Sequence, residues 1–276
     1  MMTHDELKKL AHDTRTEVLE MCIEAGTGHV TSSMSAVEIL ISLYFGGLVN
    51  VNPLEPKWSG RDRVIISKGQ CSPLIYSVLS SKGFFPKDWL QGFAQKNGNF
   101  GVHLQNSVPG VELTTGALGH GLGVAAGVAL AAKMNRELHL VYCLLGDGEL
   151  YEGSIWESAM FAAHNQLNNL VVIVDRNFMA TTDFTENMVA LEPLDKKFES
   201  FGFNVVTVNG HSTEELINSM QNLRSRKYRQ PTVIIAETTK GAGIQSMSHI
   251  PVLHGVPPQG AKGIDQARKD LAKGII

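Results

Sequence analysis

Short apolar runs that alternate with helical patterns constrain the fold of this chain more than any other sequence feature. Near-continuous apolar runs are typical of strands that helices bury on both faces of a parallel sheet. Strands that alternate with helices favour βαβ units. The sequence therefore predicts an α/β fold with a doubly wound, mostly parallel sheet and helices on both faces. The predicted strands span residues 64–67, 138–145, 170–175, 203–208 and 232–237.

Helix signals lie between these strands. Ser35 and Glu38 have the spacing of a capping box for a helix through Tyr44, and Ser212 and Glu215 have the same spacing further on. A stretch with little periodicity, 92–110, predicts a long loop of the kind that is often functional. We expect a single domain over residues 1–276. The other predicted helices are 7–22, one opening at Ser72-Pro73, 119–134, 156–167, and a terminal helix or tail over 260–276.

Composition and charge exclude several classes of function. The net charge is −3 and the isoelectric point is near 6.4, so the chain has no basic footprint for nucleic acid or an anionic membrane. The N-terminal residues are polar, and no apolar stretch reaches the roughly 18 residues that a membrane helix needs. Three scattered cysteines in apolar segments indicate reduced thiols. We therefore expect a cytoplasmic protein that binds neither nucleic acid nor membrane.

Polar residues and glycines follow two of the predicted strands. Gly146-Asp147-Gly148 ends one strand, and Asn177 ends the next. Ligands of open α/β sheets bind outside the carboxyl ends of the strands, so these residues share one edge. Carboxylate and amide oxygens suit Mg²⁺, and glycines let a phosphate approach the backbone. A bare Gly-Asp-Gly is more often an ordinary turn, but the pair with Asn177 is more specific.

Several ordered segments resemble the transketolase family and cover nearly the whole chain. The stretch from Gly146 to Asn177 is similar to that family's thiamine diphosphate signature. The resemblance implies a thiamine diphosphate-binding domain, with Mg²⁺, that transfers a two-carbon ketol unit from a ketose to an aldose. The other similar segments are Gly28-His29, 61–69, His103 with 109–112, 114–121, Lys240-Gly241 and 254–257.

The resemblance also implies roles for individual residues around the cofactor. Asp147, Asn177 and the backbone carbonyl of Met179 would hold the metal. The residues implied to contact the cofactor are Gly116, Ala117, Leu118, Gly146, Gly148, Glu149, Asn177, His254 and Gln70.

Catalytic roles follow from the same resemblance. His29, His103 and His254 match histidines that line the channel to the reacting carbon. Histidine suits proton exchange with sugar hydroxyls because its ordinary pKa is about 6.5. Glu152 and Glu157 match carboxylates of a buried network that joins two active sites across a dimer. Taken without the resemblance, both glutamates would be read as solvated.

Two departures from the family pattern affect the expected activity. Gln70 stands where the family usually has a histidine, and glutamine cannot exchange a proton near pH 7. The chain also stops after the first transketolase domain. We therefore expect a separate C-terminal subunit, with the pyrimidine-binding and C-terminal domains, in an α2β2 assembly that acts on sugars or sugar phosphates.

Other interpretations remain open from the sequence. A related thiamine diphosphate enzyme, such as a deoxyxylulose-phosphate synthase or another acyloin-forming enzyme, would share most of these residues. A transketolase that acts on a modified sugar would accommodate Gln70, and so would a non-catalytic regulatory paralogue. A Mg²⁺-nucleotide-binding module is disfavoured, because the chain has no G-x-x-x-x-G-K-[ST] loop and no G-x-G-x-x-G motif that opens a first βα turn.

Overall fold

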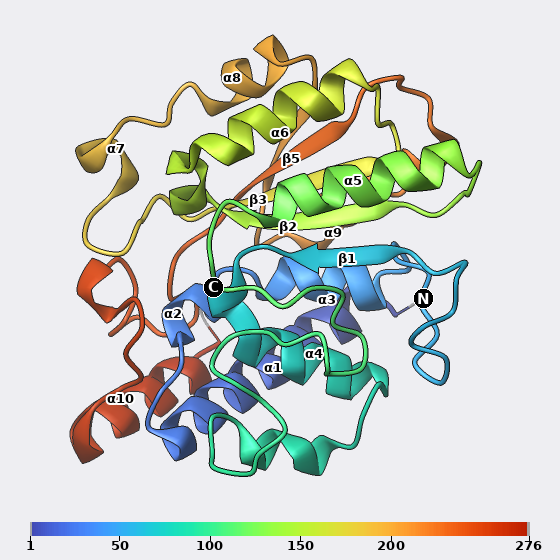
Figure 1. Cartoon of the computed structure of the whole chain (residues 1–276). Helices are drawn as coiled ribbons and strands as arrows, with labels where there is room; N and C mark the ends of the chain where they lie inside the picture. The colour runs from blue at the N-terminus through green and yellow to red at the C-terminus, as the bar shows by residue number, and fades with distance from the viewer. Residues whose placement is uncertain (1, 275–276) are drawn as a thin grey trace.

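The fold is built on a five-stranded parallel sheet with the strand order β1-β2-β3-β5-β4. The computed structural model describes residues 2–274, and Figure 1 shows the sheet between two layers of helices. All strand pairs are parallel, as the apolar runs predicted. The strands are β1 (Arg63–Ile66), β2 (Val141–Gly146), β3 (Leu170–Arg176), β4 (Asn204–Asn209) and β5 (Thr232–Glu237).

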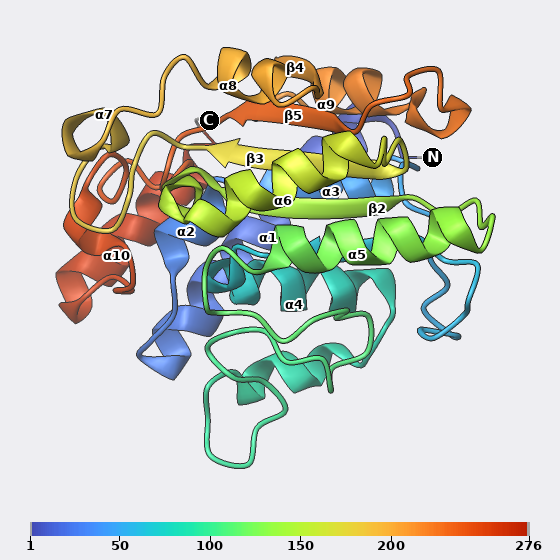
Figure 2. The same cartoon turned by 45° about the horizontal axis from the view of Figure 1, so that its top comes forward.

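Helices cover both faces of the sheet, so the predicted fold class is confirmed (Figures 1 and 2). One face carries α5 (Gly121–Met134), α6 (Gly153–His164) and α8 (Leu194–Ser200). The other face carries α1 (His4–Ala25), α3 (Val37–Phe45), α4 (Ser72–Lys82) and α9 (Thr213–Met220), and α10 (Gly260–Ala272) packs on α1. The short elements are α2 (Val30–Met34), α7 (Thr185–Met188), η1 (Gly69–Cys71), η2 (Lys87–Gly92), η3 (Asp147–Tyr151), η4 (Leu223–Ser225) and η5 (Pro251–Leu253).

Alternate side chains of each strand enter different cores. In β2, Cys143 packs with α5 and α6, whereas Tyr142 and Leu144 pack with α1, α3 and α4. Every residue of β2 and β3 is buried. A strand buried on both faces needs apolar residues at every position, which is why these strands read as continuous apolar runs.

The connections place the carboxyl ends of the strands at one edge. The chain passes from β1 to β3 in order, then α8 leads to β4 at the edge, and α9 leads back to β5. Crossovers between parallel strands are right-handed, so a connection that runs back across the sheet places its helix on the opposite face. This is why α9, which leads back from β4 to β5, lies on the face opposite to α6 and α8. The loops that follow β1, β2, β3 and β5 therefore converge.

Most predicted helices are confirmed within a few residues, including α4 with Pro73 in its first turn. The long loop is confirmed as well, with one isolated bridge between Phe93 and Phe100. The segment from residue 260 forms α10, and the last two residues of the predicted tail lie outside the described residues. Of the helices in residues 2–274, none is both long and apolar enough to cross a membrane.

The capping box predicted at Ser35 is wrong. Helix α3 begins after Ala36 and has no side-chain cap. The Ser35 hydroxyl donates to Asp175 Oδ2 at 2.7 Å, and the Glu38 carboxylate pairs with Arg15 instead of closing the cap. Both side chains are buried, so tertiary partners outcompete the local motif. The second capping box is half confirmed, because Ser212 caps α9 but the Glu215 carboxylate accepts from Asn209 N.

Candidate active site

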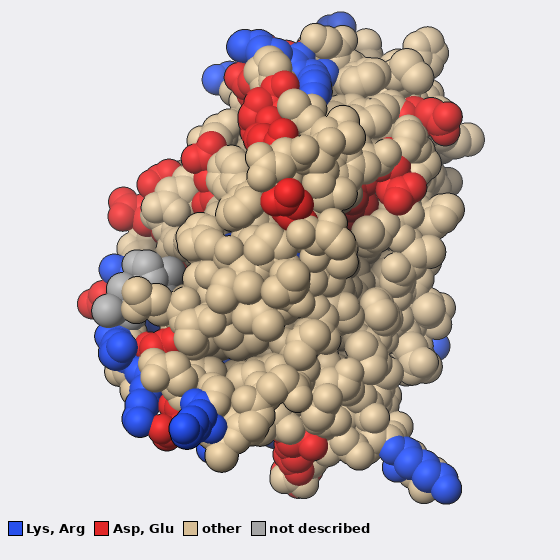
Figure 3. Space-filling view, turned by 90° about the vertical axis from the view of Figure 1, so that its left-hand side faces the viewer, with Lys and Arg blue, Asp and Glu red and all other residues tan. Residues whose placement is uncertain are grey.

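A pocket of about 240 Å³ lies where the carboxyl ends of four strands meet. It opens toward the side of the molecule shown in Figure 3, whose centre carries few charged residues. The loops after β1, β2, β3 and β5 each contribute to it, as do α2 and the loops at 103 and 254. The lining residues are His29, Ser32, Lys68, Gln70, His103, Gly116, Leu118, Gly146, Asp147, Gly148, Glu149, Tyr151, Asn177, Met179, Ala180, Thr181, Met188, Lys240 and His254.

Asp147 and Asn177 lie at the ends of the neighbouring strands β2 and β3, as the sequence predicted. Asp147 Oδ1 accepts from Gly148 N at 2.8 Å, and Oδ2 accepts from Phe178 N at 2.6 Å. Burial, together with the nearby charge of Asp175, raises the pKa of Asp147 to about 6. Arg176 Nη1 donates to Asp147 Oδ2 at 3.1 Å and partly offsets this effect, and a divalent cation would stabilise the carboxylate further.

The chemistry of the donor set fits Mg²⁺. Asp147, the Asn177 amide and the Met179 carbonyl supply hard oxygens on the same pocket. Among the described residues, no cluster of three or more His, Cys, Asp or Glu side chains could hold a metal. An ion at this place would therefore need amide and carbonyl oxygens, and oxygens from a bound phosphate, to complete its coordination.

A buried lysine, Lys68, lies in the pocket beside the strand ends. Its ammonium contacts the Asp175 carboxylate and donates to Ser35 Oγ at 3.2 Å. Burial works against the charge, but the Asp175 carboxylate outweighs it and holds the pKa of Lys68 above its ordinary value. The Thr238 hydroxyl also donates to Asp175. Asp175 therefore ties together the loops after β1 and β5 and the segment before α3.

The three predicted histidines come together in the pocket. The His29 ring centroid lies 5.5 Å from that of His103 and 5.3 Å from that of His254. Burial and the neighbouring positive groups lower the pKa of His29 to about 4 and that of His254 to about 3. Both rings are therefore neutral near pH 7. His29 Nδ1 is buried and has no hydrogen-bond partner within the described part of the chain.

Lys240 is a second buried cation at the pocket. Its Nζ lies 2.9 Å from His254 Nδ1 and donates to the Ala180 carbonyl at 2.9 Å. Burial and the nearby charge of Lys68 lower the pKa of Lys240 to about 8. Lys68 is paired with Asp175, whereas Lys240 contacts a carbonyl and a neutral imidazole, so the Lys240 ammonium can face an anionic ligand such as a diphosphate.

Glu149 organises the glycine turn at one wall of the pocket. Its Oε1 accepts from the Ser67 hydroxyl and, at 2.8 Å, from Gly119 N. Its Oε2 accepts from Gly146 N at 3.3 Å. Gly119 has a φ of +85°, and an added Cβ would lie 2.6 Å from Glu152 Cβ, so this turn requires glycine. Glu149 thus joins the ends of β1 and β2 to the turn that carries Gly116 and Leu118.

Comparison with known proteins agrees with this geometry. Residues 7–274 match the family described as "Transketolase, thiamine diphosphate binding domain". The chain belongs to the transketolase family. It is 39% identical over 261 residues to an apulose-4-phosphate transketolase subunit of Actinobacillus succinogenes, covering 94% of each chain. It is 36% identical over 239 residues to a 6-deoxy-6-sulfo-D-fructose transketolase subunit of Clostridium sp., covering 86% of each.

Solved transketolases share the fold over a part of their length. The transketolase of Campylobacter jejuni superposes with a TM-score of 0.89 at 31% identity, covering 98% of this chain and 43% of the other. That of Leishmania mexicana gives 0.88 at 28% identity, covering 99% and 42%. This transketolase chain therefore spans about two fifths of those proteins and corresponds to their thiamine diphosphate-binding part.

Three predicted residues lie outside the lining of the pocket. Ala117 is exposed between Gly116 and Leu118, and Glu152 and Glu157 are exposed on the outer side of η3 and α6. In the transketolase chain by itself, these glutamates face solvent and form no buried network.

Seven lining residues were not predicted as site residues, and the two charged ones among them are Lys68 and Lys240. The others are Ser32, Tyr151, Ala180, Thr181 and Met188. Both lysines occur in segments that resemble the family, but a lysine in a sequence gives no sign that the fold will bury it. Their position just after β1 and β5 was the available signal, because residues at the carboxyl ends of parallel strands line ligand sites.

Proposed function

We propose that this chain is the cofactor-holding subunit of a two-chain transketolase, which transfers a two-carbon ketol unit from a ketose to an aldose. The observation that carries this proposal is the convergence of three histidines, two lysines and the Asp147–Asn177 pair on one pocket at the strand ends. Relatives of similar length that are named as transketolase subunits support it.

Mg²⁺ and thiamine diphosphate would be held at the tips of β2 and β3. Asp147, Asn177 and the carbonyl of Met179 would bind the metal. When bound, thiamine diphosphate would supply the carbanion and electron-sink chemistry that ketol transfer needs. The chain's further contacts to the cofactor would come from Gly116, Ala117, Leu118, Gly146, Gly148, Glu149, His254 and Gln70.

The histidines would handle protons and hydroxyls of the sugar. His29 and His254 are neutral near pH 7, so a ring nitrogen of each can accept a hydrogen bond or a proton. His103 is exposed at the mouth of the pocket, where an incoming sugar would first meet it. Gln70 offers a neutral amide that donates and accepts hydrogen bonds without exchanging a proton.

A partner chain would close the pocket. Figure 3 shows that the centre of the site face lacks charge, which suits burial in an interface. Apolar side chains stand exposed on two segments that flank the pocket. They are Phe178, Phe184, Met188, Val189, Ile250, Val252 and Val256. We propose that the C-terminal transketolase subunit covers them and completes the site.

A second copy of this chain would pack on another face and give an α2β2 assembly. Val124, Met160 and Phe161 are 40%, 54% and 45% exposed on α5 and α6. Glu152 and Glu157 lie on the same side of the molecule, at the start of α6. Burial of this face would convert them from solvated side chains into the carboxylate network that links two sites. Each chain would act as one domain, in the cytoplasm.

The substrate is proposed to be a ketose that carries a phosphate or another modification. The two relatives described above are named for apulose 4-phosphate and for a sulfonated deoxyfructose. We propose that Gln70, which stands where the family usually has a histidine, accommodates such a sugar.

The test is reconstitution with the C-terminal subunit. We expect ketol transfer between sugar phosphates only when both chains, Mg²⁺ and thiamine diphosphate are present. Transfer by this chain alone would overturn the two-chain proposal. Release of CO₂ from pyruvate, without ketol transfer, would instead identify an acyloin-forming relative.

A further inference from the structure

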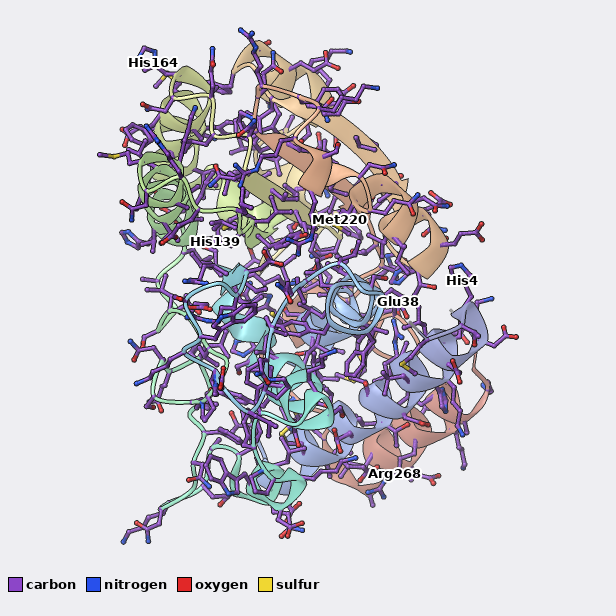
Figure 4. The ribbon with its side chains drawn as sticks, turned by 90° about the vertical axis from the view of Figure 1, so that its right-hand side faces the viewer. His4, Glu38, His139, His164, Met220 and Arg268 are labelled. Atoms are coloured by element: carbon purple, nitrogen blue, oxygen red, sulfur yellow. The ribbon has the colours of Figure 1, made fainter. Side chains whose placement is uncertain are left out.

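A row of polar side chains, buried at Arg15 and Glu38 and part-buried at His211, leads from α1 to the backbone beside Lys240. Arg15 on α1 donates to Glu38 on α3 through Nη1 at 2.5 Å and Nη2 at 2.8 Å. Glu38 Oε2 lies 2.9 Å from Nδ1 of His211, in the loop after β4. Glu38 is 4% exposed, and Figure 4 labels it inward of His4, which lies at the start of α1. We call Arg15, Glu38 and His211 the buried relay.

The bonding at His211 fixes its tautomer. The Thr239 backbone N–H donates to His211 Nε2 at 2.9 Å, so Nε2 carries no proton. Nδ1 must then carry the ring proton and donate it to Glu38. The neutral imidazole therefore donates to the Glu38 carboxylate through Nδ1 and accepts from the Thr239 main-chain amide through Nε2.

The buried relay holds the main chain on both sides of Lys240. His211 binds the amide of Thr239, and Arg15 Nε donates to the carbonyl of Ala242 at 3.2 Å. Lys240 lies between these two anchors and turns its ammonium into the pocket. None of the three relay residues lines that pocket. His211 lines a different cavity of about 350 Å³, on the far side of the same segment.

We propose that Arg15, Glu38 and His211 are positioning residues, which fix the 239–242 backbone so that the Lys240 ammonium faces the anionic tail of the cofactor. The inference rests on the proposed function, because it assigns a diphosphate to the pocket. Its reason is geometric: a long lysine side chain loses less entropy on binding when its backbone is already held in place.

The test uses three substitutions of His211 in the complex with the C-terminal subunit. His211→Phe keeps the ring and removes both hydrogen bonds. His211→Asn places its amide near the position of Nδ1 and should keep the hydrogen bond to Glu38. His211→Gln reaches the position of Nε2 and should keep the hydrogen bond from Thr239 N. His249→Phe is the matched control. His249 lines the same neighbouring cavity, and its side chain makes no hydrogen bond within residues 2–274.

Two measurements distinguish positioning from general damage. Amide hydrogen exchange at Thr239 reports the anchor, and calorimetric titration with thiamine diphosphate and Mg²⁺ reports the pocket. In His211→Phe and His211→Asn we expect faster amide exchange at Thr239 and a dissociation constant for thiamine diphosphate that is roughly 3- to 10-fold larger. A change of this size corresponds to the loss of one hydrogen bond. His211→Gln should recover most of the affinity, and His249→Phe should match the wild type.

Wild-type affinity in His211→Phe, despite faster Thr239 exchange, would overturn the inference. Equal losses in His211→Phe and His249→Phe would overturn it as well. If His211→Phe does not fold, the comparison of His211→Gln with His211→Asn decides, and equal affinities in those two variants count against positioning. Failure of the wild-type complex to take up the cofactor would overturn the proposed function itself, and with it this inference.

Discussion

Replacing Lys68 with methionine should strongly destabilise the chain, because it leaves the Asp175 carboxylate buried without its cation. The two side chains are 1% and 0% exposed, so water cannot replace the lost partner. Breaking a buried ion pair by removing one partner costs about 3–5 kcal/mol. Asp175 keeps the hydroxyls of Ser35 and Thr238, which places Lys68→Met near the lower end of that range.

Urea unfolding of the isolated chain measures this cost directly. Lys269→Met is the matched control, because Lys269 pairs with Asp265 on α10 with both side chains more than half exposed. It should change the free energy of unfolding by less than about 0.5 kcal/mol. The double variant Lys68→Met/Asp175→Asn should cost less than Lys68→Met alone. A loss below about 1 kcal/mol in Lys68→Met would refute the view that this pair organises the strand ends.

Three further predictions concern protonation, the glycine turn and assembly. His29 and His254 have folded pKa values of about 4 and about 3, below the 6.5 of an unfolded histidine. The stability that their neutral rings contribute is therefore fully present above pH 6.5 and is lost as pH falls through the interval down to those values. Imidazole NMR signals that titrate near 6.5 in the folded chain would contradict this. Gly119→Ala should weaken thiamine diphosphate binding and lower the melting temperature. Alanine is strained at a φ of +85°, and its Cβ would collide with Glu152. An unchanged melting curve would count against that strain. Phe161→Glu should convert the α2β2 assembly into an αβ pair in sedimentation experiments, and a persistent tetramer would exclude the α6 face.

The sheet and its ligand edge could be predicted because they depend on local signals. The fully buried strands β2 and β3 require unbroken apolar runs, and parallel strands bring their carboxyl ends together by topology alone. Asp147 and Asn177 follow these strands and line one pocket. The three histidines line it too, but only the family resemblance pointed to them. Their roles toward a cofactor and metal remain proposals.

The buried charges could not be predicted from the sequence. Ser35 and Glu38 have the spacing of a capping box, but Asp175 and Arg15 are better partners, and both are distant in sequence. Lys68 looks like any surface lysine until the fold brings Asp175 beside it. Tertiary hydrogen bonds and ion pairs decided these positions, and local spacing carries no information about them.

The account depends most directly on uptake of thiamine diphosphate at the strand ends together with Mg²⁺. Calorimetric titration of the reconstituted two-chain complex measures it, with Mg²⁺ present or chelated, and with Asp147→Ala beside the wild type. We expect saturable binding of one cofactor per cofactor-holding chain that chelation abolishes and Asp147→Ala greatly weakens. Equal binding with and without the metal, unchanged in Asp147→Ala, would contradict the proposed site.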